Sequence, residues 1–153
     1  FKCYVANDNS VGQIVISGNT NELNKFSEEL RKNKIKNVKL PVSAPFHCEL
    51  MKSATEKMSK EITKVEFKKP EIDIISNVTA KAVNDPSDIK KLLIEQIEKP
   101  VRWREIVINM IDSKVEKFIE IGPGKVLSGL VKRINSNVEL IQINDLEDIS
   151  KLI

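Results

Sequence analysis

His47 is the only histidine in this 153-residue chain, and it is the first candidate for general acid–base chemistry. Imidazole is the side chain that most often accepts and returns protons in enzyme active sites. His47 follows Ser43-Ala44-Pro45-Phe46 at a predicted strand-to-helix junction. A lone histidine is more often structural than catalytic, so the residue by itself leaves both interpretations open.

A histidine base needs a nucleophile, and the sequence offers it no suitable partner. Cys48 is adjacent, but neighbouring side chains on a helix point about 100° apart, so this pair is geometrically poor. We expect Cys48 to be a small buried residue. Ser128 is the serine nearest to a Gly-Xaa-Ser-Xaa-Gly elbow, but Val126 occupies the position of the upstream glycine.

The segment Gly122-Pro123-Gly124-Lys125 is the second candidate, because a glycine turn that leads into a helix can bind a phosphate. A Walker phosphate loop needs glycine at position 119 and Ser or Thr at 126, where this chain has Ile119 and Val126. We therefore interpret the segment as a tight strand-to-helix connection whose backbone amides remain able to assist an anionic ligand.

Hydrophobic periodicity indicates the elements that position these residues. Apolar residues at helical spacing predict helices over 20–33, 50–62, 86–96, 103–111 and 126–134. Apolar runs and turn residues predict a strand–turn–strand over 1–17 and strands over 38–42, 72–76, 117–121 and 138–143. The order strand, glycine loop, helix, strand favours a parallel α/β sheet in residues 70–153, and the first 42 residues are typical of a small α+β unit.

Composition places the chain among soluble globular proteins, with 41% hydrophobic and 31% charged residues. We expect neither a membrane span, which needs about 18 apolar residues, nor a signal peptide. The two cysteines lie far apart without Cys-Xaa-Xaa-Cys spacing. This spacing indicates neither a metal site nor a disulfide framework, and it favours the cytoplasm.

A basic cluster near the end of the first predicted helix raises the question of an acidic partner. Its members fall within nine residues: Arg31, Lys32, Lys34, Lys36 and Lys39. Aromatic residues make up 5% of the chain and none interrupts the cluster, so the stacking platforms of nucleic-acid-binding proteins are missing and no nucleic acid is expected. A solvated helix end and an acidic protein partner both remain open.

Four segments resemble the malonyl-CoA:acyl carrier protein transacylase family of bacterial fatty acid biosynthesis. They occur in the family's order: Gly12-Gln13-Ile14-Val15-Ile16-Ser17-Gly18, Pro41-Val42-Ser43-Ala44-Pro45-Phe46-His47-Cys48-Glu49-Leu50-Met51, Gln96 with Pro100-Val101-Arg102-Trp103, and Glu120-Ile121-Gly122-Pro123-Gly124-Lys125-Val126-Leu127. The resemblance covers the family's second half. The family's seryl nucleophile elbow, oxyanion-hole glutamine and malonyl-binding arginine belong upstream of Phe1, so we expect the histidine without the serine.

The resemblance implies an α/β fold with two parts. Residues 43–153 would form the C-terminal part of an α/β-hydrolase-like parallel-sheet core, and residues 1–42 would form part of a ferredoxin-like small subdomain. The implied reaction is a ping-pong transfer of malonyl from malonyl-CoA to a serine and then to the phosphopantetheine thiol of acyl carrier protein. It needs no metal or other cofactor.

The resemblance also implies site residues. His47 would be the general acid and base, and the backbone carbonyl of Gln96 would orient it. Phe46 would crowd an α-methyl group and so favour malonyl over methylmalonyl. Asn9 and Gln13 would line the cleft between the subdomains. The cations Arg31 and Lys34 would either meet the acidic carrier protein or remain solvated.

Two alternatives to a transacylase remain. One is a non-catalytic acyltransferase-like module that binds a carrier protein or an acyl group, and the other is an α/β binding domain whose His47 is structural. An upstream Gly-Xaa-Ser-Xaa-Gly sequence would favour the enzyme over the module. We expect the 153-residue chain alone to be inactive.

Overall fold

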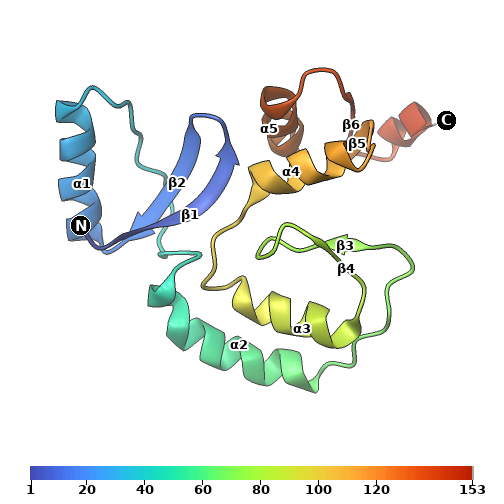
Figure 1. Ribbon diagram of the computed structural model, residues 1–153, viewed down its shortest axis with the longest axis horizontal. Helices are drawn as coiled ribbons and strands as arrows, with labels where there is room; N and C mark the ends of the chain where they lie inside the picture. Colours follow the sequence, from blue (N-terminus) through green and yellow to red (C-terminus); the bar gives the residue numbers. More distant parts are fainter. Residues whose placement is uncertain (153) are drawn as a thin grey trace.

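An antiparallel hairpin of β1 (Cys3–Ser10) and β2 (Gln13–Gly18) opens the chain, as the sequence predicts. The computed structural model describes residues 1–152. Gly12 turns the hairpin with a φ of 75°, a conformation that glycine adopts without steric cost. Two register shifts interrupt the pairing of β1 with β2. Figure 1 shows the hairpin between α1 (Thr20–Lys32) on one side and α4 (Trp103–Asp112) on the other.

The helix α1 begins where the sequence places it, because Asn19 caps its first turn. The Asn19 side chain accepts a hydrogen bond of 3.0 Å from the backbone amide of Asn21. The rings of Phe1 and Phe26 lie 5.4 Å apart and fix the helix against the start of β1.

The strand expected over 38–42 is wrong, because this described segment has no regular structure. Val38 and Val42 are 76% and 60% exposed, so no sheet face covers them. A strand needs a neighbour for its backbone hydrogen bonds, and alternating apolar residues cannot supply one. A short 3-10 helix (Glu49–Met51) then leads into α2 (Lys52–Lys64), which replaces the single helix expected over 50–62.

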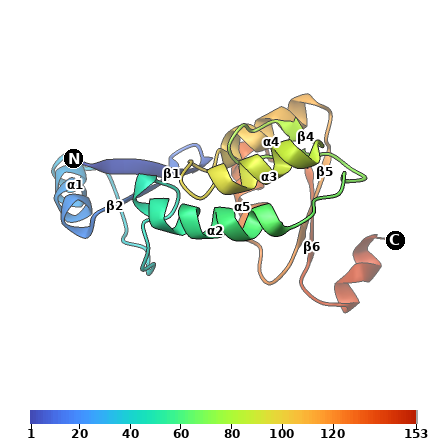
Figure 2. The same cartoon turned by 90° about the horizontal axis from the view of Figure 1, so that it is seen from below.

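The segment after α2 forms a small hairpin instead of joining a parallel sheet. β3 (Ile74–Ile75) is shorter than the strand expected over 72–76, and it pairs antiparallel with the unexpected β4 (Ala82–Val83). Residues 76–81 connect the two strands, and a connection this short permits only antiparallel pairing. Asp85 caps α3 (Pro86–Glu95), which begins at the predicted position 86, and Figure 2 shows α3 alongside α2.

The last part of the chain follows the sequence prediction closely. β5 (Lys117–Ile121) and β6 (Glu139–Ile143) form a parallel pair, and the helix α5 (Val126–Ile134) connects them. Residues Glu147–Leu152 form a 3-10 helix. The parallel sheet expected for 70–153 is therefore confirmed for these two strands and wrong for β3 and β4. The mixed α/β class is confirmed.

The β1–β2 hairpin is joined directly to the segment that starts α4. Val101 donates to the carbonyl of Ala6 over 2.8 Å and accepts from the amide of Asp8 over 2.9 Å. The Asp8 carboxylate also accepts hydrogen bonds from two guanidinium nitrogens of Arg104, and the shorter of these is 2.7 Å. Behind these contacts α4 and α5 enclose the core residues Ile106, Val107, Leu130 and Val131.

Candidate active site

His47 lies in the turn between the irregular segment and the 3-10 helix, and its backbone has a φ of 60°. This left-handed conformation is unfavourable for a residue with a Cβ, by about 1–2 kcal/mol. Such a conformation persists only where its surroundings hold it, and held conformations of this kind cluster at functional sites. The contacts on both sides of His47 therefore decide where its ring points.

The ring of His47 is held by a backbone carbonyl on a different element. His47 Nδ1 lies 2.8 Å from the carbonyl oxygen of Gln96. A carbonyl oxygen only accepts, so Nδ1 carries the proton of this hydrogen bond, and the neutral ring keeps a lone pair on Nε2. The structure thus brings His47 and Gln96 together, with Nε2 as the nitrogen that remains able to accept a proton.

The Gln96 carbonyl is free to accept because α3 ends at Glu95. The last carbonyls of a helix have no partner within the helix. Pro100, four residues after Gln96, has no amide hydrogen with which to continue the ladder. The sequence therefore leaves an acceptor at this position, and the tertiary structure places His47 opposite it.

Asn77 supports Gln96 through a contact that sequence reasoning missed. The Asn77 side chain donates a hydrogen bond to Gln96 Oε1 over 3.1 Å. The backbone carbonyl of Asn77 accepts a hydrogen bond from the backbone amide of Arg102 over 3.2 Å. Arg102 forms a two-point ion pair with Glu105 and also donates to the carbonyl of Val78. Asn77 lies 19 residues before Gln96 in the sequence, so no local spacing pointed to it.

The residues that flank His47 are anchored as well. Ser17 Oγ donates to the Phe46 carbonyl over 2.7 Å, and Cys48 Sγ lies 3.1 Å from the Pro45 carbonyl. Cys48 is 2% exposed, which confirms the prediction of a small buried residue. The Tyr4 hydroxyl donates to the Glu49 carboxylate. This hydrogen bond, aided by partial burial, raises the pKa of Tyr4 to about 12.

The other expected site residues lie at varied distances from this centre. Phe46 precedes His47 and is 48% exposed. Asn9 and Gln13 lie at the tip of the β1–β2 hairpin, where Gln13 accepts a hydrogen bond from Arg133 of α5. Gln13 and Ser17 are four positions apart on β2, a distance of about 13 Å along the strand. Arg31 and Lys34 are exposed at the end of α1.

The backbone amides of the glycine loop and of the first turn of α5 donate hydrogen bonds to side-chain oxygens of the protein itself. Gly124 donates to Asn144 Oδ1 over 2.7 Å, and the amides of Leu127 and Ser128 donate to the two oxygens of Glu120 over 3.0 and 2.8 Å. Partial burial raises the pKa of Glu120, but the hydrogen bonds from Ser128 and the helix amides outweigh it and lower the pKa overall. The expectation that these amides assist an anionic ligand is therefore wrong.

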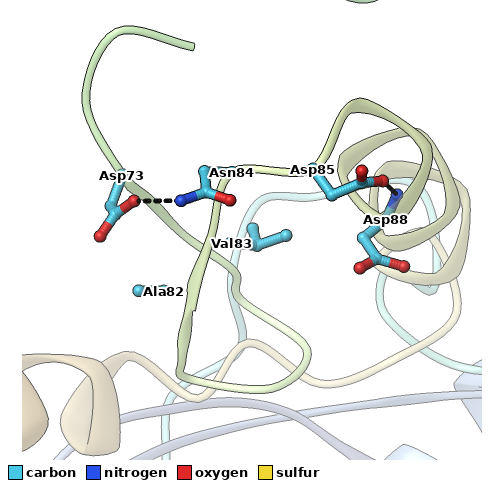
Figure 3. Close-up of a pocket in the computed structure, with 6 residues that line it drawn as sticks. All are labelled: Asp73, Ala82, Val83, Asn84, Asp85 and Asp88. Carbon is cyan, nitrogen blue, oxygen red and sulfur yellow. Dashed lines mark hydrogen bonds between the residues drawn. The ribbon is translucent and has the colours of Figure 1, made fainter. Parts of the chain in front are cut away.

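A separate pocket lies at the β3–β4 hairpin and the start of α3, and Figure 3 shows its lining. It contains none of the expected site residues. Asp73 accepts from Asn84, and Asp85 accepts from the first amides of α3, so these carboxylates already have structural partners. Within residues 1–152 no group of acidic, cysteine or histidine side chains is arranged to hold a metal ion. Among residues 1–152 we find no helix with the length and apolar composition that a membrane span requires.

Residues 2–146 match the model of the acyl transferase domain. The chain is 45% identical over 146 residues to the malonyl CoA-acyl carrier protein transacylase of Bacillus subtilis and 41% identical over 145 residues to that of Staphylococcus aureus. These alignments cover 95% and 94% of this chain but 46% and 47% of the relatives. The chain thus spans about half the length of the curated relatives it matches.

Solved malonyltransferase structures have the same fold as this chain over the part that they share. An acyl carrier protein S-malonyltransferase from Vibrio cholerae superposes with a TM-score of 0.93 at 41% identity, over 99% of this chain and 50% of that one. A malonyl CoA-acyl carrier protein transacylase from Clostridium perfringens superposes with a TM-score of 0.92 at 43% identity, over 98% and 48%. A third match, with a TM-score of 0.92 at 33% identity, over 97% and 48%, is a type II PKS acyl-carrier protein in complex with its malonyl-transacylase.

Proposed function

Because this chain belongs to the acyl transferase domain family, we propose that it is the histidine-bearing part of a malonyl-CoA:acyl carrier protein transacylase. The observation that carries the proposal is the 2.8 Å contact between His47 Nδ1 and the Gln96 carbonyl, because it leaves Nε2 as a free base. In this proposal the nucleophilic serine lies in the part of the complete polypeptide that corresponds to the uncovered half of the relatives. The 153-residue chain alone is then inactive.

In the first half of the reaction His47 acts as base and then as acid. Nε2 accepts the hydroxyl proton while the serine oxygen attacks the thioester carbonyl of malonyl-CoA. The tetrahedral intermediate collapses, the carbon–sulfur bond breaks, and the Nε2 proton passes to the coenzyme A thiolate. The malonyl group is left on the serine as an ester.

The second half repeats these steps with the carrier protein. The phosphopantetheine thiol gives its proton to Nε2 and attacks the seryl ester. The carbon–oxygen bond breaks, and the proton returns to the serine oxygen. In each half the Gln96 carbonyl faces the transient positive charge of the imidazolium, the role that a carboxylate performs in Ser-His-Asp enzymes. A metal ion or other cofactor has no part in these steps.

Specificity is proposed to depend on Phe46, which immediately precedes His47. Phe46 is 48% exposed and is therefore available to a substrate. A ring beside the base crowds the α-carbon of an acyl group, so malonyl is preferred over methylmalonyl. A difference of one methyl group is worth about 1–3 kcal/mol when shape alone discriminates. Asn9 and Gln13 are proposed to line the same cleft from the hairpin tip.

We also propose that the fold has two parts. Residues 43–153 are the C-terminal part of an α/β-hydrolase-like core, and residues 1–42 are part of a ferredoxin-like subdomain. The partner is acyl carrier protein in the cytoplasm, with Arg31 and Lys34 as candidate contacts for its acidic surface. Both cations are exposed at the end of α1, so they are accessible to such a partner.

The intact mass of the complete polypeptide tests the proposal. Incubation with malonyl-CoA is expected to add one malonyl group under denaturing conditions, and phosphopantetheinylated carrier protein is expected to remove it. His47→Ala is expected to slow adduct formation by roughly 100- to 10,000-fold, because it removes the general base. A polypeptide that binds carrier protein but never gains the adduct would instead be the non-catalytic module.

A further inference from the structure

Two side chains of the β1–β2 hairpin hold the His47 turn from one face. Tyr4 and Ser17 are directly opposite each other in the hairpin register, so their side chains project from the same face of the sheet. Ser17 binds the carbonyl of Phe46, immediately before His47, and Tyr4 binds the carboxylate of Glu49, two residues after it. The histidine therefore lies between two anchors that come from a single cross-strand pair.

The Ser17 contact acts on the part of the backbone that sets the histidine's direction. The Phe46 carbonyl belongs to the peptide plane that contains the His47 nitrogen. The φ angle of His47 is the rotation about the bond from this nitrogen to the His47 Cα. A hydrogen bond of 2.7 Å to the carbonyl holds the plane. With the plane held, a φ of 60° directs the ring to the Gln96 carbonyl on the other side.

The burial of Ser17 makes this contact specific. Ser17 is 8% exposed, so its hydroxyl has little water as an alternative partner. Ser10, on the other strand of the same hairpin, is 1% exposed, and among residues 1–152 its hydroxyl finds no hydrogen-bond partner. The hairpin thus contains two buried serines, of which only Ser17 donates a hydrogen bond to the histidine turn.

We propose that Ser17 is a positioning residue that holds the Phe46–His47 peptide plane, and that Tyr4 is the second anchor of the same turn. This inference rests on the proposed function, because it concerns the efficiency of the His47 base. Ser17 touches no reacting atom. Its effect reaches the reaction only through the direction of the His47 ring.

Four serine variants of the complete polypeptide, together with Tyr4→Phe, test the proposal. Ser17→Ala removes the donor, and Ser10→Ala makes the same chemical change at a buried serine without a partner. Ser17→Thr and Ser17→Val form a matched pair, because their side chains have nearly the same shape and only threonine keeps the hydroxyl. The readouts are kcat and KM for malonyl transfer, and the imidazole Nδ1 proton signal of His47 in nuclear magnetic resonance, assigned by its loss in His47→Ala.

Ser17→Ala and Ser17→Val are expected to lower kcat by roughly 3- to 10-fold, as the loss of one neutral hydrogen bond allows, with KM nearly unchanged. Both are expected to weaken the protected Nδ1 proton signal. Ser17→Thr is expected to keep the signal and most of kcat, and Ser10→Ala is expected to change neither. Tyr4→Phe is expected to act in the direction of Ser17→Ala, because it removes the second anchor.

Equal kcat and equal Nδ1 signals in the Thr and Val variants would overturn the proposal, and so would an effect of Ser10→Ala as large as that of Ser17→Ala. If Ser17→Ala fails to fold, the Thr and Val pair decides, because both residues favour strands. Failure of the proposed function is recognised separately. In that case His47→Ala would leave transfer unchanged, while the Nδ1 signal would still test the Ser17 contact.

Discussion

At the scale of single residues, the orientation of His47 depends on backbone atoms more than on side-chain identity. The Nδ1 partner is the carbonyl of Gln96, an atom that every amino acid possesses. The Gln96 side chain points elsewhere and binds Asn77. Substitution at position 96 therefore changes the support of the carbonyl but does not remove the carbonyl.

This arrangement predicts unequal costs for His47 and Gln96. We expect Gln96→Ala to lower kcat/KM by about tenfold or less, the equivalent of one hydrogen bond, and His47→Ala to lower it by a factor of 100 or more, roughly. Steady-state transfer by the complete polypeptide measures both. Asn77→Ala is the matched control and should resemble Gln96→Ala, because it breaks the same bond from the other side. A loss in Gln96→Ala as large as that in His47→Ala would contradict the backbone role.

At the scale of elements, the connection from β5 to α5 is stabilised by contacts that replace a bound anion. Glu120 at the end of β5 accepts from two amides in the first turn of α5, and Asn144 after β6 accepts from Gly124. Carboxylate at a helix N-terminus also complements the helix dipole. The loop therefore has a structural role in joining strand to helix.

The two glycines nearest this helix are expected to respond oppositely to alanine. Gly124 has a φ of 95°, and a Cβ there would meet no atom within 4 Å, so Gly124→Ala costs backbone strain of about 1–3 kcal/mol. Gly129 lies inside α5 with equal space and no positive φ, so Gly129→Ala should stabilise by about 1 kcal/mol. Denaturant unfolding of the complete polypeptide measures both changes. Destabilisation by both substitutions would show that space, not φ, is limiting.

At the scale of the whole molecule, the strand β5 and the first turn of α5 carry apolar residues that lack cover. Ile121 and Val126 are 79% and 72% exposed, and Ile119 and Leu127 are 44% and 43% exposed. Parallel strands are normally covered on both faces. Since the chain spans about half the length of its relatives, we expect this surface to be covered in the complete polypeptide.

This expectation predicts that a charge at position 121 improves the behaviour of the isolated chain in solution but destabilises the complete polypeptide. In the isolated 153-residue chain, Ile121→Lys should reduce self-association in sedimentation, because it interrupts an exposed apolar patch. In the complete polypeptide the same change should lower the free energy of unfolding by about 2 kcal/mol or more, because it buries a charge in place of an apolar side chain. Ile72→Lys, at a residue 80% exposed outside the sheet, is the control for both. An unchanged stability of the complete polypeptide would mean that position 121 stays exposed there.

Local sequence patterns determined most elements of this protein. Asn19 and Asp85 mark the starts of α1 and α3 because their side chains cap the helices within one turn. The apolar run before Gly122 predicted β5, and the spacing after it predicted α5. His47 was found by its residue type, and the Gln96 contact was expected from the family resemblance. These features depend on neighbours a few residues away or on motifs visible in the chain.

Only the tertiary structure decided the features that depend on distant partners. The strand expected over 38–42 is absent because no neighbour supplies its backbone hydrogen bonds. Ser17 and Tyr4 lie next to the His47 turn only because the hairpin folds onto it, 29 and 45 residues away from their partners in the sequence. The glycine loop does not offer the expected anion site, because its backbone amides already donate hydrogen bonds to the side chains of Asn144 and Glu120. Hydrogen bonds between residues far apart leave no periodic signal, so the folded chain alone assigns them.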